Sequence, residues 1–379
     1  MENEIINKYI TNNLIHWKNV NKNESKLIKI IKKYKLRICK IKLQNGKVYV
    51  EKKYNTNGNV KLNKAITFLS DVVKMYQGLN TYIYLNISDT LLHEKINIYN
   101  VDGTLGNKKK LNDFVWGTSK SDKDYIRIVE SEKINDCNES FPIFCFERNR
   151  EMTGILFPTF GADNNNFKVS QNIDNFTWDK KTINRPIYRG KNICCDVSNF
   201  DKIKLINFSN KYPEDTDFKF CSNKSHPIWG KYMVSESLLK FCQNKNVIDK
   251  NVNLKKLRKD YYSQDNFVSF DYLFKHKFIV TVGSAKNRKW YESNSCVLEY
   301  KFKNKEFFHE DIFNDMEDIV YFDENNYFEK IRELKKNNYE LAKKIVERRK
   351  EKFKNYLHYP NLVKWYGKFL LEYQKLLNM

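Results

Sequence analysis

FDYLFKHKFIVTVGSAKNRKWYESNSCVLEY, residues Phe270–Tyr300, predicts a strand, a turn, a helix and a second strand in succession. The run Phe278–Val282 is apolar and β-branched and is closed by Gly283, a pattern typical of a buried strand in a parallel sheet. The segment from Ser284 to about Glu292 is expected to be helical, and Cys296–Leu298 has the composition of another buried strand. The stretch therefore predicts a βαβ unit.

Positive charge gathers at the start of the expected helix. Ser284 stands where an N-cap residue belongs, and Lys286, Arg288 and Lys289 follow closely. A helix N-terminus offers unpaired N–H groups and a positive dipole end, so cations placed there favour an anionic partner such as a phosphate. An ordinary βαβ crossover with solvated cations explains these residues equally well, because a full glycine fingerprint is absent.

The rest of the chain alternates strands with helices in both halves, which predicts an α/β fold with mostly parallel sheets. Asn45-Gly46 between two alternating segments predicts a hairpin turn. Residues 97–140 are polar and loop-rich, and 305–313 are expected to be helical. The remaining expected helices are 1–35, 65–75, 199–211, 235–242, 324–356 and 362–377, and the remaining strands are 36–43, 47–52, 81–87, 141–147, 186–189, 218–221 and 318–322.

The composition is that of a folded chain with room for two domains. Its 379 residues are 41% hydrophobic and 15% aromatic, which excludes a largely disordered chain. The formal charge of +22 favours acidic partners, so a basic polyanion-binding protein is one alternative. Lysine and arginine are spread along the whole chain rather than gathered in one block, which argues against a specific nucleic-acid partner.

The N-terminal sequence MENEIINKYITNNLIHW lacks the basic start and apolar core of a signal peptide, and no apolar run approaches the roughly 18 residues of a membrane span. We therefore expect a cytoplasmic protein without a transmembrane segment; for a viral or parasite protein this would be the host cytoplasm. The eight cysteines are expected to be free thiols. Cys194, Cys195, Cys221 and His226 fit no recognised zinc spacing, so no metal site is expected.

Two further segments carry candidate functional residues. Asp89 follows the expected strand Thr81–Ile87, and open α/β sheets place their chemistry at such carboxyl ends. A helix N-cap is the alternative role for Asp89. Phe157, Pro158 and Phe160 form an aromatic-proline segment that either lines a pocket or packs as a surface loop.

Several motifs together resemble glycosyltransferase family 90, the group of capsule-associated, lipopolysaccharide-modifying and Rumi-like protein O-glucosyltransferases. The resemblance covers roughly the C-terminal half of the chain. Its motifs are Trp178…Lys180-Lys181…Tyr188-Arg189-Gly190, Asn199…Lys204-Leu205…Ser209, His276–Val280, Ser284–Lys286, Ser293–Leu298 and the tail from Ile319 to Leu377.

The chain departs from the family pattern in three places. The family's Asp-Gly after the apolar strand is absent, and Gly283 follows Val282 directly. Lys286 stands in place of the family's arginine, unless Arg288 takes that role, and Lys191 replaces a serine. Because lysine holds a phosphate as a point charge rather than a bidentate fork, a catalytically degenerate family member is a second alternative.

The resemblance implies a glycosyltransferase-B-like fold of two Rossmann-like domains with the active cleft between them. It implies an N-terminal acceptor-side domain at 1–175, a sugar-nucleotide-binding domain at 176–358 and a helix at 359–379 that crosses back to the N-terminal domain. The polar segment Ala162–Asn175 is the boundary candidate.

The implied activity is inverting, metal-independent transfer of a hexose or pentose, glucose or xylose above all, from a UDP-sugar to a glycan or protein hydroxyl. No cofactor is implied. The resemblance places Asp89 as the catalytic base. The implied donor-binding residues are Arg189, Gly190, Ser284, Lys286 and Arg288, and the implied acceptor-side residues are Phe157, Pro158 and Phe160.

Overall fold

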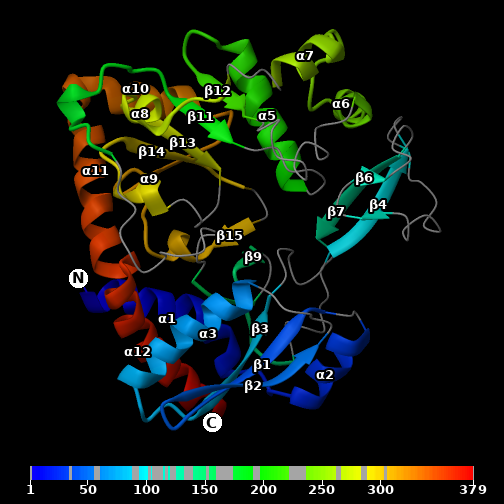
Figure 1. Ribbon diagram of the computed structural model, residues 1–379, viewed down its shortest axis with the longest axis vertical. Coiled ribbons are helices and arrows are strands. Elements are labelled where there is room, and N and C mark those ends of the chain that lie inside the picture. Colours follow the sequence, from blue (N-terminus) through cyan, green and yellow to red (C-terminus); the bar gives the residue numbers. More distant parts are fainter. Residues whose placement is uncertain are drawn as a thin grey trace.

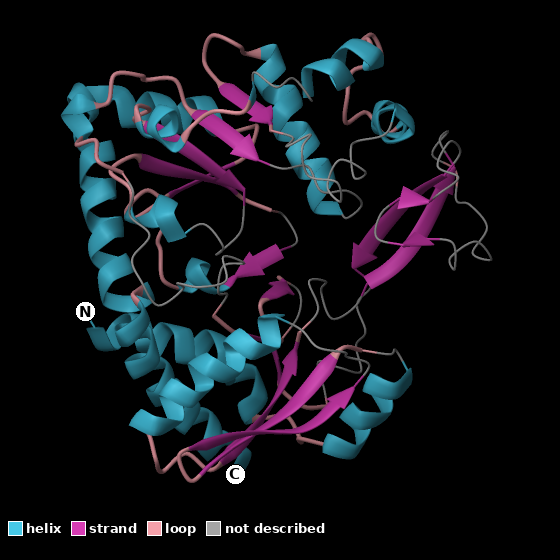
Figure 2. Ribbon diagram, viewed as in Figure 1, coloured by secondary structure: helices cyan, strands magenta, loops and turns pink. Residues whose placement is uncertain are grey.

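Two five-stranded sheets organise the computed structural model (Figures 1 and 2). The prediction of an α/β chain is confirmed. Each sheet, with the helices packed on it, forms one α/β unit. The structure describes residues 2–33, 36–54, 60–87, 94–100, 104, 114–115, 118–119, 125–131, 140–150, 153–158, 174–190, 197–221, 236–261, 266–282, 288–302 and 305–378.

The N-terminal sheet has the strand order β10-β8-β3-β1-β2. The hairpin is confirmed, with Asn45 and Gly46 at φ 51° and 70°, the left-handed values that an Asn-Gly turn supplies. The expectation of mostly parallel pairing is wrong here, because β1 pairs antiparallel with both β2 and β3, and only β3, β8 and β10 are parallel. The strands are β1 (Ile38–Gln44), β2 (Lys47–Tyr54), β3 (Thr81–Asn86), β8 (Ile143–Cys145) and β10 (Ile155–Leu156).

Helices cover both faces of this sheet. On one face α1 (Glu2–Lys18), α3 (Val60–Met75) and α12 (Tyr359–Asn378) bury a shared apolar core with the strands. On the other face α2 (Glu24–Lys33) packs on a smaller cluster that includes Tyr84. The sheet is thereby enclosed, and the C-terminal helix α12 belongs to its covering layer (Figure 1).

Gly367 allows α12 to approach α3 closely, and this contact yields a prediction. A Cβ atom at Gly367 would lie 2.2 Å from Cδ2 and from Cε2 of Tyr76, whose hydroxyl donates to the Lys364 carbonyl at 2.6 Å. In an exposed helix, alanine stabilises over glycine by about 1 kcal/mol. Here we expect Gly367→Ala to reduce the free energy of unfolding by about 1–3 kcal/mol, because the added methyl overpacks the contact.

Urea unfolding of a double-mutant cycle checks this expectation. In a Tyr76→Ala background the ring is gone, so Gly367→Ala should be neutral or stabilising. The same loss of stability in both backgrounds would contradict the close approach.

The second sheet is wholly parallel, with the order β12-β11-β13-β14-β16. Strand β13 matches the predicted Phe278–Val282, and β14 extends the predicted strand to Tyr300. In chain order the strands lie 2-1-3-4-5, so the winding direction reverses between β11 and β13, the position at which open α/β sheets bind ligands. The strands are β11 (Ile187–Gly190), β12 (Asp217–Phe220), β13 (Phe278–Val282), β14 (Cys296–Tyr300) and β16 (Val320–Phe322).

The second sheet also has helices on both faces. Alternating strand residues such as Val280 and Leu298 bury one core with the outer helices, whereas Ile279 and Val297 belong to the core that continues into the N-terminal unit. The long C-terminal pattern is two helices, separated at Lys336–Tyr339 by left-handed residues. The helices of this unit are α5 (Val197–Lys211), α6 (Glu236–Asn244), α7 (Leu254–Tyr261), α8 (Phe270–Phe274), α9 (Arg288–Glu292), α10 (Tyr327–Lys335) and α11 (Glu340–Lys352).

Two segments differ from expectation. The region expected to be loop contains an antiparallel ribbon of β4 (Glu94–Asn100) and β7 (Tyr125–Ser131), and also the short pair β5 (Phe114–Val115) and β6 (Thr118–Ser119). The segment expected to be helical at 305–313 begins as strand β15 (Lys305–Phe307) and continues as a 3₁₀ turn, Phe308–Asp311. Within the described residues, no helix has the length and apolar character needed to cross a bilayer.

Candidate functional site

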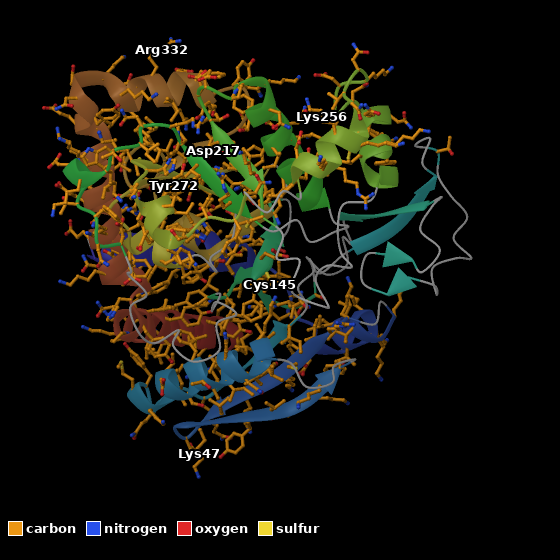
Figure 3. All side chains as sticks on the ribbon, turned by 45° about the horizontal axis from the view of Figure 1, so that its top comes forward. Lys47, Cys145, Asp217, Lys256, Tyr272 and Arg332 are labelled. Atoms are coloured by element: carbon orange, nitrogen blue, oxygen red, sulfur yellow. The ribbon has the colours of Figure 1, made fainter. Side chains whose placement is uncertain are left out.

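The carboxyl ends of the two sheets are brought together by a short ribbon. Strand β8 runs directly into β9 (Glu147–Asn149), and β14 is followed within a few residues by β15. β9 and β15 pair antiparallel, so the chain leaving one sheet is joined to the chain leaving the other. Figure 3 shows Cys145, the last residue of β8, near the middle of the molecule and Lys47 far from it. The carboxyl edges therefore face each other, as an active site between the units requires.

Charged side chains reinforce this junction. Arg148 Nε lies 2.8 Å from a Glu306 carboxylate oxygen, and Arg150 lies 2.5 Å from Glu310. The amides of Asn12 and Asn13 on α1 donate to the Asp311 carboxylate at 2.8 and 3.1 Å. The 305–311 segment of the second unit is thus held by side chains of the first.

Arg189 lies on β11, beside the reversal of winding, but its guanidinium is directed away from the carboxyl edge. Its terminal nitrogens donate to the carbonyls of Tyr188 and Asp217 and, at 2.7 Å, to the Asp217 carboxylate. Asp217 opens β12 and pairs with Ile187, so the contact reaches back toward the amino edge. Burial alone would raise the pKa of Asp217, but Arg189 outweighs it and holds that pKa below the usual value. Arg189 therefore braces the sheet in this structure.

Gly190 ends β11, and its missing side chain has a local explanation. A Cβ atom there would lie 1.9 Å from the Tyr188 hydroxyl oxygen, because the buried Tyr188 ring lies over the position. The space left by glycine is therefore filled by the chain's own tyrosine.

The remaining expected donor residues follow β13. Ser284 and Lys286 lie outside the described residues, and Arg288 begins α9, with its side chain outside the described part. α9 ends at Glu292, the end that the sequence predicts for this helix. In the sequence, Ser284, Lys286 and Arg288 come after the carboxyl end of β13, one of the two strands that flank the reversal of winding.

The expected base and acceptor residues belong to the N-terminal unit. Asp89 lies outside the described residues, two positions beyond the buried Ile87 at the carboxyl end of β3. Phe157 has no exposed surface and packs edge-on against Phe68 at a centroid distance of 5.9 Å. Pro158 is also buried, and Phe160 lies outside the described residues. Phe157 is thus a core residue and neither part of a surface loop nor, in this structure, an exposed wall of a pocket.

A buried ionic network near α9 was not predicted. Lys181 and Asp174 pair at 2.9 Å with both side chains fully buried, and the Asp174 carboxylate also accepts from the Asn294 backbone N–H at 2.8 Å. On α11, Arg349 donates to the carbonyls of Tyr291, Ser293 and Ser295, and burial lowers its pKa to about 10. The network fixes the segment that joins α9 to β14, and nothing in the local sequence distinguishes Lys181 from its neighbour Lys180.

A second buried cluster lies beneath the junction. His309 Nε2 contacts Glu299 at 2.8 Å, and the Tyr291 hydroxyl donates to the other oxygen of Glu299 at 2.9 Å. Burial lowers the pKa of His309, but the carboxylates of Glu299, Glu310 and Asp311 outweigh it, so the pKa is raised overall. Burial raises the pKa of Glu310 and of Asp311. All three groups on this turn therefore hold their protons more tightly in the folded state.

This cluster predicts a pH dependence of stability. The stabilisation from protonated His309 is fully present below the unfolded pKa of about 6.5 and is lost as the pH rises through the higher folded value. His276 has the opposite effect on the pH dependence of stability, because burial lowers its pKa in the folded state. We expect His309→Gln to remove the component of the unfolding free energy that falls between pH 6 and pH 8, as measured by urea unfolding at both values. His16, which is exposed on α1, provides the control His16→Gln, and an unchanged pH slope in His309→Gln would contradict the assignment.

Among the residues that the structure describes, no group of three or more histidine, cysteine, aspartate or glutamate side chains is placed to hold a metal ion. Described cysteines such as Cys145 and Cys296 are free thiols, and burial raises the pKa of both to about 12.

No protein-family profile matches the sequence, and no curated protein does. Among solved structures, the chain is similar to a glycosyltransferase from Rickettsia africae ESF-5 at 14% identity and a TM-score of 0.30, with 53% of this chain and 50% of that chain covered. It is also similar to the C-terminal domain of a glycosyl transferase group 1 family protein (LpcC) from Francisella tularensis, at 14% identity and a TM-score of 0.25, with 53% of this chain and 96% of that chain covered.

Proposed function

We propose that this protein is a glycosyltransferase that moves a hexose or pentose from a UDP-sugar to a hydroxyl of a glycan or protein acceptor. The observation that carries the proposal is the pairing of β9 with β15, which turns the carboxyl edges of the two sheets toward each other. Parallel α/β sheets bind ligands at this edge and at the reversal of strand order. The segment with Ser284 and Lys286 leaves one edge at that reversal, and Asp89 follows a strand at the other.

In this proposal the donor diphosphate binds after β13. Ser284 would donate to it, and Lys286 and Arg288 would offset the charge that UDP gains as it leaves. Arg189 and Gly190, whose contacts are with β11 and β12, would act indirectly by fixing the end of β11. Because Arg189 is committed to Asp217, the lysine and arginine after β13 are the principal cations of the site.

Asp89 is the proposed base. It would accept the proton of the acceptor hydroxyl as that oxygen attacks the anomeric carbon from the side opposite UDP, which inverts the configuration. The proposal needs no metal or other cofactor. The segments 1–175, 176–358 and 359–379 are the proposed division into acceptor-side domain, donor-side domain and crossing helix, with Phe157, Pro158 and Phe160 supporting the acceptor side.

Thermal unfolding in the presence of nucleotides tests the proposal. UDP and its cognate UDP-sugar should raise the unfolding temperature, since a ligand at a hundredfold excess over its dissociation constant stabilises the folded state by about 2.7 kcal/mol. The panel contains UDP, UDP-glucose, UDP-xylose, UDP-galactose and GDP-mannose.

The panel also separates the two alternatives. Stabilisation by a polyanion such as heparin, with none by any nucleotide, would support the basic polyanion-binding alternative suggested by the charge of +22. Nucleotide stabilisation without hydrolysis or transfer of the sugar would support the catalytically degenerate alternative.

A further inference from the structure

A pocket of about 230 Å³ opens at the outer end of the second sheet. Lys301 directly follows β14, and Asp323 directly follows β16, so the pocket lies on the carboxyl edge. Arg150, from the N-terminal unit, closes one side. β16 lies two strands from β13, which at the spacing of a sheet is about 10 Å. The pocket is therefore separate from the proposed diphosphate site but on the same side of the molecule.

The charges that line the pocket are largely compensated. Arg150 pairs with Glu310, and Lys330 pairs with Asp315, both at 2.5 Å. Lys301 and Asp323 remain as one positive and one negative group. Together with Glu310, which pairs with Arg150 from outside the lining, the charges around the pocket balance, which disfavours a phosphate or another strongly charged ligand.

Several hydrogen-bonding groups at the pocket are not engaged by other described residues. Asp323 accepts the N–H groups of Asn325 and Asn326 at one oxygen, which leaves its second oxygen available. Asn326 accepts from the Asp323 N–H, but its side chain makes no cap bond to α10, which leaves its amide N–H₂ available. The Lys301 ammonium lies over the Tyr321 ring, 5.0 Å from its centroid, with no hydrogen bond within the described part of the chain. The pocket therefore presents hydrogen-bonding groups next to aromatic side chains: a carboxylate oxygen, an amide and an ammonium.

We propose that this pocket binds a neutral hydroxylated ring, namely a monosaccharide unit of the acceptor. A sugar hydroxyl can donate to Asp323 while it accepts from Lys301 or Asn326, and the C–H face of the ring can pack against aromatic side chains such as Phe302. The assignment to the acceptor rests on the proposed glycosyltransferase function. It deepens that function, since it requires an acceptor with a sugar unit about 10 Å from the donor diphosphate.

Saturation-transfer difference NMR on the full chain, with methyl glucoside as the probe, tests the inference. We expect saturable binding to the wild type and at least tenfold weaker binding to the double variant Lys301→Met, Asp323→Asn. Asparagine keeps the oxygen that accepts the two backbone N–H groups, and Lys301 is exposed, so both changes should preserve the fold. Lys335→Met, an exposed position on α10 outside the lining, should bind as the wild type does.

The outcomes separate this inference from the proposed function. No saturable binding of methyl glucoside, equal binding by the double variant, or displacement of the probe by inorganic phosphate would each overturn the sugar subsite. UDP affinity is measured on the same samples and should be within twofold in the double variant. Methyl glucoside binding that depends on these side chains would uphold the subsite chemistry even if UDP failed to bind, whereas UDP binding without it would uphold only the donor site.

Discussion

Asp89→Asn is expected to lower the turnover of sugar transfer by about 10²–10⁴-fold, the usual contribution of a general base. The change removes the group that would accept the acceptor's proton but keeps nearly the same shape. Affinity for UDP should stay within about twofold, because the donor is assigned to the opposite edge. Turnover in single-turnover assays and the dissociation constant of UDP by calorimetry separate the two effects.

The neighbouring Ser88→Ala and Thr90→Ala changes provide matched controls, since they flank the carboxylate without replacing it. Both should retain most of the turnover. Full turnover in Asp89→Asn would remove Asp89 as the base and leave the N-cap as its role.

Lys181→Met is expected to lower the free energy of unfolding by about 3–5 kcal/mol, because removal of one member of a buried ion pair leaves the other charge uncompensated. The affected charge is Asp174, whose carboxylate pairs with the Lys181 ammonium at 2.9 Å while both side chains are fully buried. The same ammonium also donates to the Phe274 carbonyl at 2.6 Å, which would lose its partner. The urea midpoint of the first unfolding transition measures the loss.

Lys180→Met is the matched control, because Lys180 is adjacent in sequence but exposed. It should change the stability by no more than about 0.5 kcal/mol, as is usual for surface substitutions. Replacing both members, as in Asp174→Leu with Lys181→Met, should be less destabilising than Lys181→Met alone. Equal stability of the two lysine variants would show that the buried pair contributes nothing.

The elements with strong local patterns could be predicted from the sequence. Strand β13 has the predicted bounds, because an apolar β-branched run closed by glycine has few alternatives. The Asn45-Gly46 turn was predictable because both residues tolerate positive φ. The broad apolar face of Leu362–Leu377 likewise predicted the helix that is α12.

The elements that depend on distant partners could not be predicted. Lys305–Phe307 becomes a strand because it pairs with Glu147–Asn149, and the local pattern contains no trace of that partner. The antiparallel placement of β1 beside β3 is likewise a choice of tertiary structure. Local composition identifies a strand, but long-range pairing decides its neighbours and therefore the type of sheet.

The candidate site shows the same division. The positions of Asp89 and Ser284 just beyond strand ends were readable from the sequence, and the topology puts those strand ends on facing edges. The burial of Phe157 and the commitment of Arg189 to Asp217 were not readable, because both depend on residues far away in the chain. An aromatic or cationic residue in a suggestive motif does not by itself reveal whether its side chain is free for a ligand.

Hydrogen exchange with and without UDP tests whether the donor binds at the carboxyl end of β13. We expect saturating UDP to slow amide exchange in peptides covering 283–292, the segment after β13, and to leave exchange in the outer hairpin at 38–54 unchanged. Protection confined to other segments, or no protection at saturating UDP, would contradict a donor site at the carboxyl end of β13.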